Sequence, residues 1–285
     1  MPRERRDREI EAVVSSHRGL TQRLSYGKIN WIQAYSESPY MPNALCMVWK
    51  CVLALFGLGI LAWSVATGPN VYWLIYLTHW MLLTHVVYLV FQAMVAANVH
   101  LRIGHDSDAW KEPRVPLFVR ALWFCEQICL PGGLLVTIVY WTLLANGDSA
   151  AINYFAHALV WTACMIDFLL GMQPFVLVQA VWFIVWALVY AFWSLIHGKS
   201  GLTNGKDPTD PSYCTCIYTV LNWTTNAKSA AGLAFGLAIF AVPAACFAIW
   251  CTNFVRVQAV YVVNDDDLPH GGAIVAKKSS AAPEA

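Results

Sequence analysis

The sequence predicts an all-α fold, a polytopic membrane helical bundle of about six transmembrane helices with both termini in the cytoplasm. Of the 285 residues, 58% are apolar and only 12% are charged, which is about half the charged share of an average soluble domain (~25%). The apolar residues form blocks of about 20 or more, the length that a helix needs to cross the hydrocarbon core. The alternating pattern of a transmembrane barrel is absent, so helices are the structure that satisfies the backbone in lipid.

Residues 1–44 are polar and predict a cytoplasmic tail, whose last part is expected to lie along the membrane interface or to be solvated. Six apolar blocks follow and predict the transmembrane spans, with boundaries at 45–66, 71–98, 116–145, 150–172, 175–197 and 229–255. The region 198–228 is the longest connection between spans, and residues 256–285 are predicted to form a disordered cytoplasmic tail.

The second block, Val71–Asn98, is the segment around which we expect the bundle to form. It carries no Asp, Glu, Lys or Arg, yet it contains Thr78, His79, Thr84 and His85. A helix that served only as a membrane anchor would not need imidazoles in its interior. We therefore expect Thr78 to face an inward cavity.

Basic residues set the predicted orientation. The N-terminal tail, the loop after the second span and the tail after the sixth carry most of them, whereas the first two loops on the opposite side have none. Cytoplasmic loops are enriched in Lys and Arg, so these three regions are assigned to the cytoplasm and the loop 198–228 to the outer side. The net charge of +1 and the absence of a basic patch with interleaved aromatics give no indication of nucleic-acid binding.

Thr78 and His157 are the candidate catalytic residues. Each lies about seven residues inside the predicted outer end of its span, or roughly 10 Å along a helix. A hydroxyl and an imidazole at matched depth on two helices can form a nucleophile and base pair. The alternative is structural, since Thr and His also make hydrogen bonds between membrane helices.

Other polar residues inside the spans are expected to support the bundle. A buried ion pair of Asp167 with Arg120 or with Lys50 would lie near the cytoplasmic boundary, because isolated charges in lipid are costly. His85 and Glu126 lie nearer the middle of their spans and are expected to bond each other or to form the polar floor of a cavity.

No metal and no cofactor is predicted. His79 and His85 are six residues apart and point to different faces of a helix. Most of the nine cysteines fall inside apolar blocks and are expected to act as small buried hydrophobes. Cys214 and Cys216 lie in the long loop, at a spacing that is poor for a mutual disulfide.

Three segments carry a resemblance to a known family. YLTHW (Tyr76–Trp80) resembles the Tyr-Leu-Thr-Asn-Trp type motif of Rolling stone-like proteins, which belong with the androgen-induced membrane proteins. NYFAHALVWTACMIDFLL (Asn153–Leu170) resembles the second motif of that group, in which an acidic residue follows a His by ten positions. CIYTVLNW (Cys216–Trp223) resembles the Ile-Tyr-Pro-x-x-Asp-Trp segment of Rolling stone-like proteins, and the resemblance covers most of residues 45–255.

The resemblance implies an activity as well as a fold. The androgen-induced branch consists of multi-pass hydrolases of fatty acid esters of hydroxy fatty acids, with a Thr nucleophile and an essential His. By motif these are Thr78 and His157, the pair that depth had indicated. The chain departs from the family at Thr219, where Pro is usual, and at Asn222, where Asp is usual. It also lacks a second His close to His157.

Two functions are therefore carried forward. The first is an intramembrane threonine/histidine hydrolase of lipid esters, whose partners would be membrane lipids and a lipid ester substrate. The second is a non-enzymatic Rolling stone-like membrane protein that acts in cell adhesion, fusion or signalling. Both place the chain as an integral protein of the plasma membrane or the endoplasmic reticulum.

Overall fold

The computed structural model describes residues 30–68, 70–111, 115–145, 150–204, 209 and 215–266. Residues 1–29 of the predicted N-terminal tail, residues 267–285 of the C-terminal tail, and residues 205–208 and 210–214 of the loop 198–228, Cys214 among them, lie outside the described residues. The described residues form helices and contain no strand.

Six helices are long and apolar enough to cross a membrane. They are Asn43–Thr67, Leu77–Ile103, Leu117–Leu144, Ala151–Leu170, Leu177–Ser200 and Ala227–Val257. The predicted all-α membrane bundle with six spans is thus confirmed, and the chain is an integral membrane protein. The orientation of the termini stays a prediction.

Four of the spans combine α-helix with a π-helical turn. α5 (Leu77–Asn98) continues into η2 (Val99–Ile103), and α6 (Leu117–Val139) continues into η4 (Tyr140–Leu144). The fourth span is made of α7, η5 and α8, and the sixth of α10, η8 and α11. Their bounds are Ala151–Tyr154, Phe155–Leu159, Val160–Leu170, Ala227–Gly236, Leu237–Ala241 and Val242–Asp266. π-Helical turns of this kind are often found at functional sites.

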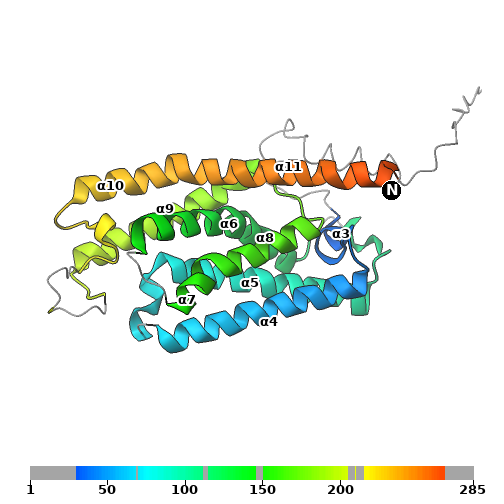
Figure 1. Ribbon diagram of the computed structural model, residues 1–285, viewed down its shortest axis with the longest axis horizontal. Helices are drawn as coiled ribbons and strands as arrows, with labels where there is room; N and C mark the ends of the chain where they lie inside the picture. Colours follow the sequence, from blue (N-terminus) through cyan, green and yellow to red (C-terminus); the bar gives the residue numbers. More distant parts are fainter. Residues whose placement is uncertain are drawn as a thin grey trace, which may run out of the picture.

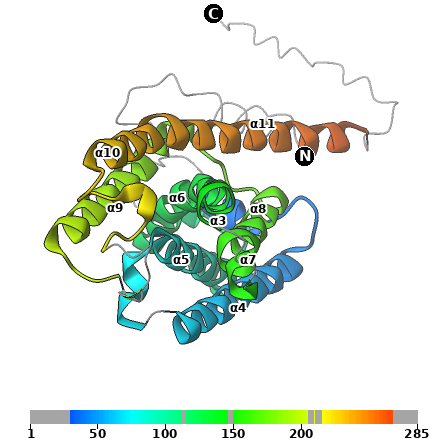
Figure 2. The same ribbon diagram turned by 60° about the vertical axis from the view of Figure 1, so that its left-hand side comes forward.

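α5 and α6 form the centre of the bundle (Figures 1 and 2). Their most apolar stretches are 56% and 67% buried, compared with 22–33% for the other four spans. α4 (Asn43–Thr67) packs against one side of α5, while α9 (Ala180–Ser200) and α11 pack against α6. The helix that the sequence placed at the centre therefore does lie there, together with α6.

α5 begins at Leu77 rather than at the predicted Val71. The intervening residues form a 3₁₀ helix, η1 (Asn70–Ile75), that folds back on α4. The Trp73 indole donates to the Ser64 hydroxyl at 3.0 Å, and its ring stacks on His79. The apolar character of this stretch is explained by this packing, and hydropathy alone does not separate it from the helix that follows.

A short helix, α3 (Trp31–Ser36), occupies part of the predicted N-terminal tail. Trp31, Ile32 and Tyr35 are almost fully buried and belong to the main core, where Trp31 meets Phe118 edge-on. The sequence suggested an interfacial or solvated segment here. The difference arises because the apolar residues of α3 share one face and fit beside α6.

Glycines allow α6 to approach its neighbours closely. A Cβ on Gly133 would lie 2.2 Å from Trp161 and 2.7 Å from His85. The Trp161 indole also donates to the Leu130 carbonyl at 2.8 Å, next to Pro131 inside α6. The Pro-Gly-Gly segment therefore lets α5, α6 and α8 meet at the centre of the bundle.

Candidate functional site

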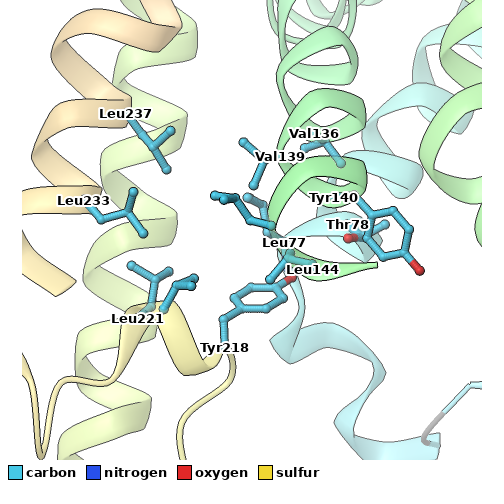
Figure 3. Close-up of a pocket in the computed structure, with 12 residues that line it drawn as sticks. Leu77, Thr78, Val136, Val139, Tyr140, Leu144, Tyr218, Leu221, Leu233 and Leu237 are labelled. Carbon is cyan, nitrogen blue, oxygen red and sulfur yellow. Dashed lines mark hydrogen bonds between the residues drawn. The ribbon is translucent and has the colours of Figure 1, made fainter. Parts of the chain in front are cut away.

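A cavity lies at the N-terminal end of α5, where the predicted outer ends of several helices meet (Figure 3). The space open to the centre of a water-sized sphere is about 50 Å³, larger than the ~10–15 Å³ that one water needs. The walls are mostly Leu and Val side chains from α5, α6, η4, the 3₁₀ helix η7 (Thr219–Leu221), α10 and η8. The lining residues are Leu77, Thr78, Val136, Val139, Tyr140, Leu143, Leu144, Tyr218, Val220, Leu221, Leu233 and Leu237.

Hydroxyl groups supply the polar character of this cavity. They belong to Thr78 of α5, to Tyr140 of η4 and to Tyr218. Tyr218 lies in residues 215–223 of the loop 198–228, which we call the outer segment. Thr78 is the second residue of α5 and is 8% exposed. The predicted inward-facing position of Thr78 in a cavity therefore agrees with its placement.

The Tyr218 hydroxyl caps the start of α5. Its oxygen accepts a hydrogen bond from the Leu77 N–H at 3.0 Å, and both Tyr218 and the neighbouring Thr78 line the cavity. The first N–H groups of a helix have no partner within the helix, so a hydroxyl at this point satisfies one of them. No side chain of the N-cap residue Tyr76 performs that task.

Burial raises the pKa of the Tyr218 phenol to about 12, although the hydrogen bonds from Thr78 and Leu77 oppose part of this effect. The phenol is therefore protonated at physiological pH. It can accept and donate hydrogen bonds but does not act as a base.

The outer segment that carries Tyr218 is held by contacts on both sides of it. Tyr76 donates its hydroxyl proton to the Asn204 carbonyl at 3.1 Å, and the Asn204 amide donates to the Cys216 carbonyl at 2.7 Å. Farther along, the Trp223 indole donates to the Ser194 hydroxyl at 3.1 Å. Cys216 is also disulfide-bonded.

Tyr190 on α9 adds another hydroxyl to this cluster. It donates to the Ile75 carbonyl at 3.0 Å, just before the start of α5. The start of α5 is thus connected to α9 and to the outer segment by hydroxyl groups, in a region where the remaining walls are apolar.

His157 lies on η5, the π-helical turn between α7 and α8, and is 8% exposed. Its ring stacks on Tyr140 with the centroids 3.4 Å apart and the planes 12° from parallel. The Thr137 hydroxyl donates to the His157 carbonyl. Tyr140 therefore connects the predicted pair, because it lines the cavity with Thr78 and stacks on His157.

His85 and Glu126 are each hydrogen-bonded to a different residue. His85 Nδ1 lies 2.8 Å from the Met81 carbonyl of its own helix, so this nitrogen carries the proton and donates. Glu126 is fully buried and accepts a hydrogen bond from Tyr35 of α3. Neither side chain lines the cavity at Thr78.

Asp167 pairs with Lys50, one of the two partners that the sequence left open. The Lys50 ammonium donates to both carboxylate oxygens at 3.0 Å, and both side chains are almost fully buried. The Trp49 indole donates to Asp167 at 3.1 Å. Arg120 is exposed instead, and its guanidinium donates to the Val115 carbonyl at 3.1 Å.

The remaining candidates for metal or thiol chemistry have other surroundings. Within the described part of the chain, no group of three His, Cys, Asp or Glu side chains could hold a metal ion. His79 stacks on Trp73 and contacts its carbonyl. The free cysteines are Cys46, Cys125, Cys129, Cys164 and Cys246, which are buried, and Cys51 and Cys251, which are partly buried.

Depth and motif arguments did not identify Tyr140 or Tyr218 as part of the site. Tyr218 lies within CIYTVLNW, so its motif drew attention to the segment but not to the residue. Tyr140 carried no signal in the sequence, since tyrosines near the ends of spans are common at membrane interfaces.

No protein-family model, no curated protein and no solved structure matches this chain.

Proposed function

We propose that this integral membrane protein is a lipid ester hydrolase of the Rolling stone-like and androgen-induced superfamily, with Thr78 as nucleophile and His157 as general base. The observation that carries the proposal is the position of Thr78, in the wall of a mostly apolar cavity inside a membrane bundle. Such a site suits a substrate with a long apolar chain and a single polar ester group.

The lining of the cavity supports a lipid as the substrate. Leu and Val side chains from α6 and α10 face each other across it, so an acyl chain would lie between these two helices (Figure 3). Thr78 lies at the predicted outer end of α5. The ester would then be bound near the level at which lipid carbonyl groups lie in the outer leaflet.

The arrangement of the three motif segments supports membership of the family. YLTHW contributes Thr78, and CIYTVLNW contributes Tyr218, whose hydroxyl accepts from the Leu77 N–H of YLTHW. The segment Asn153–Leu170 contributes His157, which stacks on the cavity residue Tyr140. Two of the segments that the resemblance singled out thus line one cavity, and the third contacts the cavity residue Tyr140 through His157.

The proposed reaction is acyl transfer in two steps. The Thr78 oxygen attacks the ester carbonyl carbon while His157 takes the hydroxyl proton, and His157 then gives this proton to the departing alkoxide. A water molecule next attacks the acyl-threonine, transfers a proton through His157 to the Thr78 oxygen and releases the fatty acid. Stacking on Tyr140 covers one face of the imidazole, whereas the nitrogens exchange protons at its edge.

Fluorophosphonate labelling of the protein in membranes tests this proposal. We expect labelling of the wild type and its loss in Thr78→Ala and His157→Ala, because one variant lacks the nucleophile and the other lacks the base. Thr84→Ala is the matched control and should be labelled like the wild type. Thr84 lies on the same helix, does not line the cavity, and donates to the Trp80 carbonyl at 2.7 Å.

A folded wild-type protein that is not labelled would refute the hydrolase proposal. The non-enzymatic function in adhesion, fusion or signalling would then be favoured, and Thr78 would be explained as a packing residue at the start of α5.

A further inference from the structure

Glu126 is a buried titratable side chain that the proposed reaction does not use. It lies on α6, is fully buried, and accepts a hydrogen bond from the Tyr35 hydroxyl of α3. We propose that Glu126 is a proton-binding site that α3 covers: its carboxyl carries a proton while α3 is docked and releases this proton when α3 undocks. The lining of the Thr78 cavity does not include Glu126, so this site stands whether or not the protein is a hydrolase.

The surroundings of Glu126 favour a neutral carboxylic acid. Its Oε2 accepts from Tyr35, whereas its Oε1 has no hydrogen-bond partner among the residues that the structure describes. Within the same residues, Glu126 takes part in no ion pair, since the pairs are Lys50 with Asp167 and His105 with Glu37. A buried carboxylate without a counter-ion is so costly that the group takes up a proton instead.

The charged groups around Glu126 are engaged with other partners. They are Lys50 of α4, Asp167 of α8 and Arg256 of α11. Lys50 and Asp167 lie 3.0 Å apart, so their opposite charges largely cancel at Glu126. Arg256 donates to backbone carbonyls at the end of α8. The other titratable neighbours, besides Tyr35, are the phenol of Tyr88 on α5 and the thiol of Cys129 on α6.

α3 covers the carboxyl of Glu126 at the end of the bundle opposite the Thr78 cavity (Figure 1). The Tyr35 ring packs against Trp123, one turn before Glu126 on α6, with the ring centroids 6.2 Å apart. Trp31 meets Phe118 edge-on at 6.4 Å. Because these aromatic contacts and the Tyr35 hydroxyl all belong to α3, undocking of this short helix would expose Glu126 to water.

Docking of α3 and binding of the proton are therefore linked. When α3 undocks, water solvates the carboxylate, and Glu126 ionises as an exposed glutamate does near neutral pH. The docked state thus binds one more proton than the undocked state. Stability rises with pH only where the open state binds more protons, so here the docked state is favoured at low pH and weakens as the pH rises.

A second titratable contact of α3 requires a control. The His105 imidazole lies 3.6 Å from the Glu37 carboxylate, which directly follows α3, and 3.4 Å from the Ser36 hydroxyl. His100 lies 3.4 Å from the other ring nitrogen of His105. Protonation of His105 would strengthen its contact with Glu37, so this pair also favours docking at low pH. The variant Glu37→Gln removes that contribution and leaves Glu126 unchanged.

The test measures amide hydrogen exchange of the peptide that contains α3, in the full chain in detergent, from mildly acidic to mildly alkaline pH. Glu126→Gln keeps the shape of the side chain and an acceptor for Tyr35, but it cannot ionise. The ratio of the wild-type rate to the Glu126→Gln rate cancels the intrinsic pH dependence of exchange. We expect this ratio to rise by up to about 10-fold per pH unit, the effect of one proton released per opening. Glu37→Gln should show the same rise.

The infrared difference spectrum between wild type and Glu126→Gln detects the proton directly. We expect the C=O stretch of a protonated carboxylic acid at neutral pH, and its loss in the variant. If the variant does not fold, the isotope shift of this band in wild type grown with labelled glutamate replaces the comparison, because glutamates in water are ionised at that pH.

Three results would overturn the proposal. Carboxylate bands in place of the carboxylic acid band would show that Glu126 is ionised while it is buried. An exchange ratio that does not change with pH would show that α3 docks independently of the proton. A rise that disappears in Glu37→Gln would assign the pH dependence to the contact with His105.

Discussion

Lys50 and Asp167 show how single charged residues are accommodated inside an apolar bundle. Both are 1% exposed, and the Lys50 ammonium forms an ion pair with the Asp167 carboxylate at 3.0 Å. The Gln92 side-chain oxygen accepts a further hydrogen bond from the Lys50 ammonium, and the Gln173 amide donates to Asp167 at 3.2 Å. The pair is thus neutral as a unit, and its remaining hydrogen-bonding groups have partners.

We predict that Lys50→Met, which keeps the length of the side chain, destabilises the bundle. It leaves the Asp167 carboxylate buried without its counter-ion, which costs about 3–5 kcal/mol when a buried pair is broken. Thermal unfolding in one detergent measures the effect. The control is Arg120→Ala, where an exposed side chain is removed and the expected change is within about 0.5 kcal/mol.

A second substitution tests whether the unpaired Asp167 carboxylate causes this loss of stability. Asp167→Asn added to Lys50→Met removes the unpaired charge, so the double variant should recover part of the lost stability. A double variant less stable than Lys50→Met alone would indicate that Asp167 stabilises the bundle independently of Lys50.

Among the helices, α6 illustrates how local sequence determines a packing distance. Gly133 lies where α5 and α8 come closest to α6, since a Cβ there would overlap Trp161 and His85. Both of these neighbours are ring systems that cannot bend away. Glycine weakens a helix by itself, so its presence is explained by the close contact that it permits.

We predict that Gly133→Ala lowers the stability by about 1–3 kcal/mol, the usual cost of overpacking a core. Gly59→Ala in α4 is the matched control, because a Cβ there meets nothing within 4 Å. This change should be neutral or stabilising by up to about 1 kcal/mol, since alanine favours helix more than glycine does. Equal unfolding temperatures of the two variants would contradict the packing account.

For the whole molecule, an even number of spans places both ends of the membrane domain on one side. Figure 1 shows α3 and the C-terminal end of α11 at the same end of the bundle. The Thr78 cavity lies at the opposite end, at the start of α5. The distribution of Lys and Arg assigns the first of these ends to the cytoplasm.

We predict that epitope tags fused to either terminus are detected only after cells are permeabilised. The reason is that basic residues in both tails favour the cytoplasmic side of a membrane. A tag in the loop 198–228 is the matched control and should be detected on intact cells if the protein reaches the plasma membrane. Detection of either terminal tag on intact cells would reverse the topology and place the cavity at the inner leaflet.

The sequence by itself determined the class of fold, the number of spans and most of their boundaries. These depend on the length and hydropathy of each segment, which are local properties of the sequence. They determine the class of fold because a segment in lipid must be long and apolar enough to cross it and must satisfy its own backbone hydrogen bonds. It also indicated that Thr78 faces a cavity, because a hydroxyl in an apolar helix is best placed toward the interior. The ion pair of Asp167 was anticipated for the same reason, with its partner left open between Lys50 and Arg120.

The tertiary structure alone decided which side chains meet. Hydropathy could not distinguish η1 from the start of α5, and it did not reveal that α3 is buried, because both depend on the shape of the neighbouring helices. Tyr218 reaches the start of α5 from a segment far along the chain, and Tyr140 lines the cavity with Thr78 while it stacks on His157. Contacts of this kind depend on how six helices pack around one another, and no local pattern in the sequence encodes that arrangement.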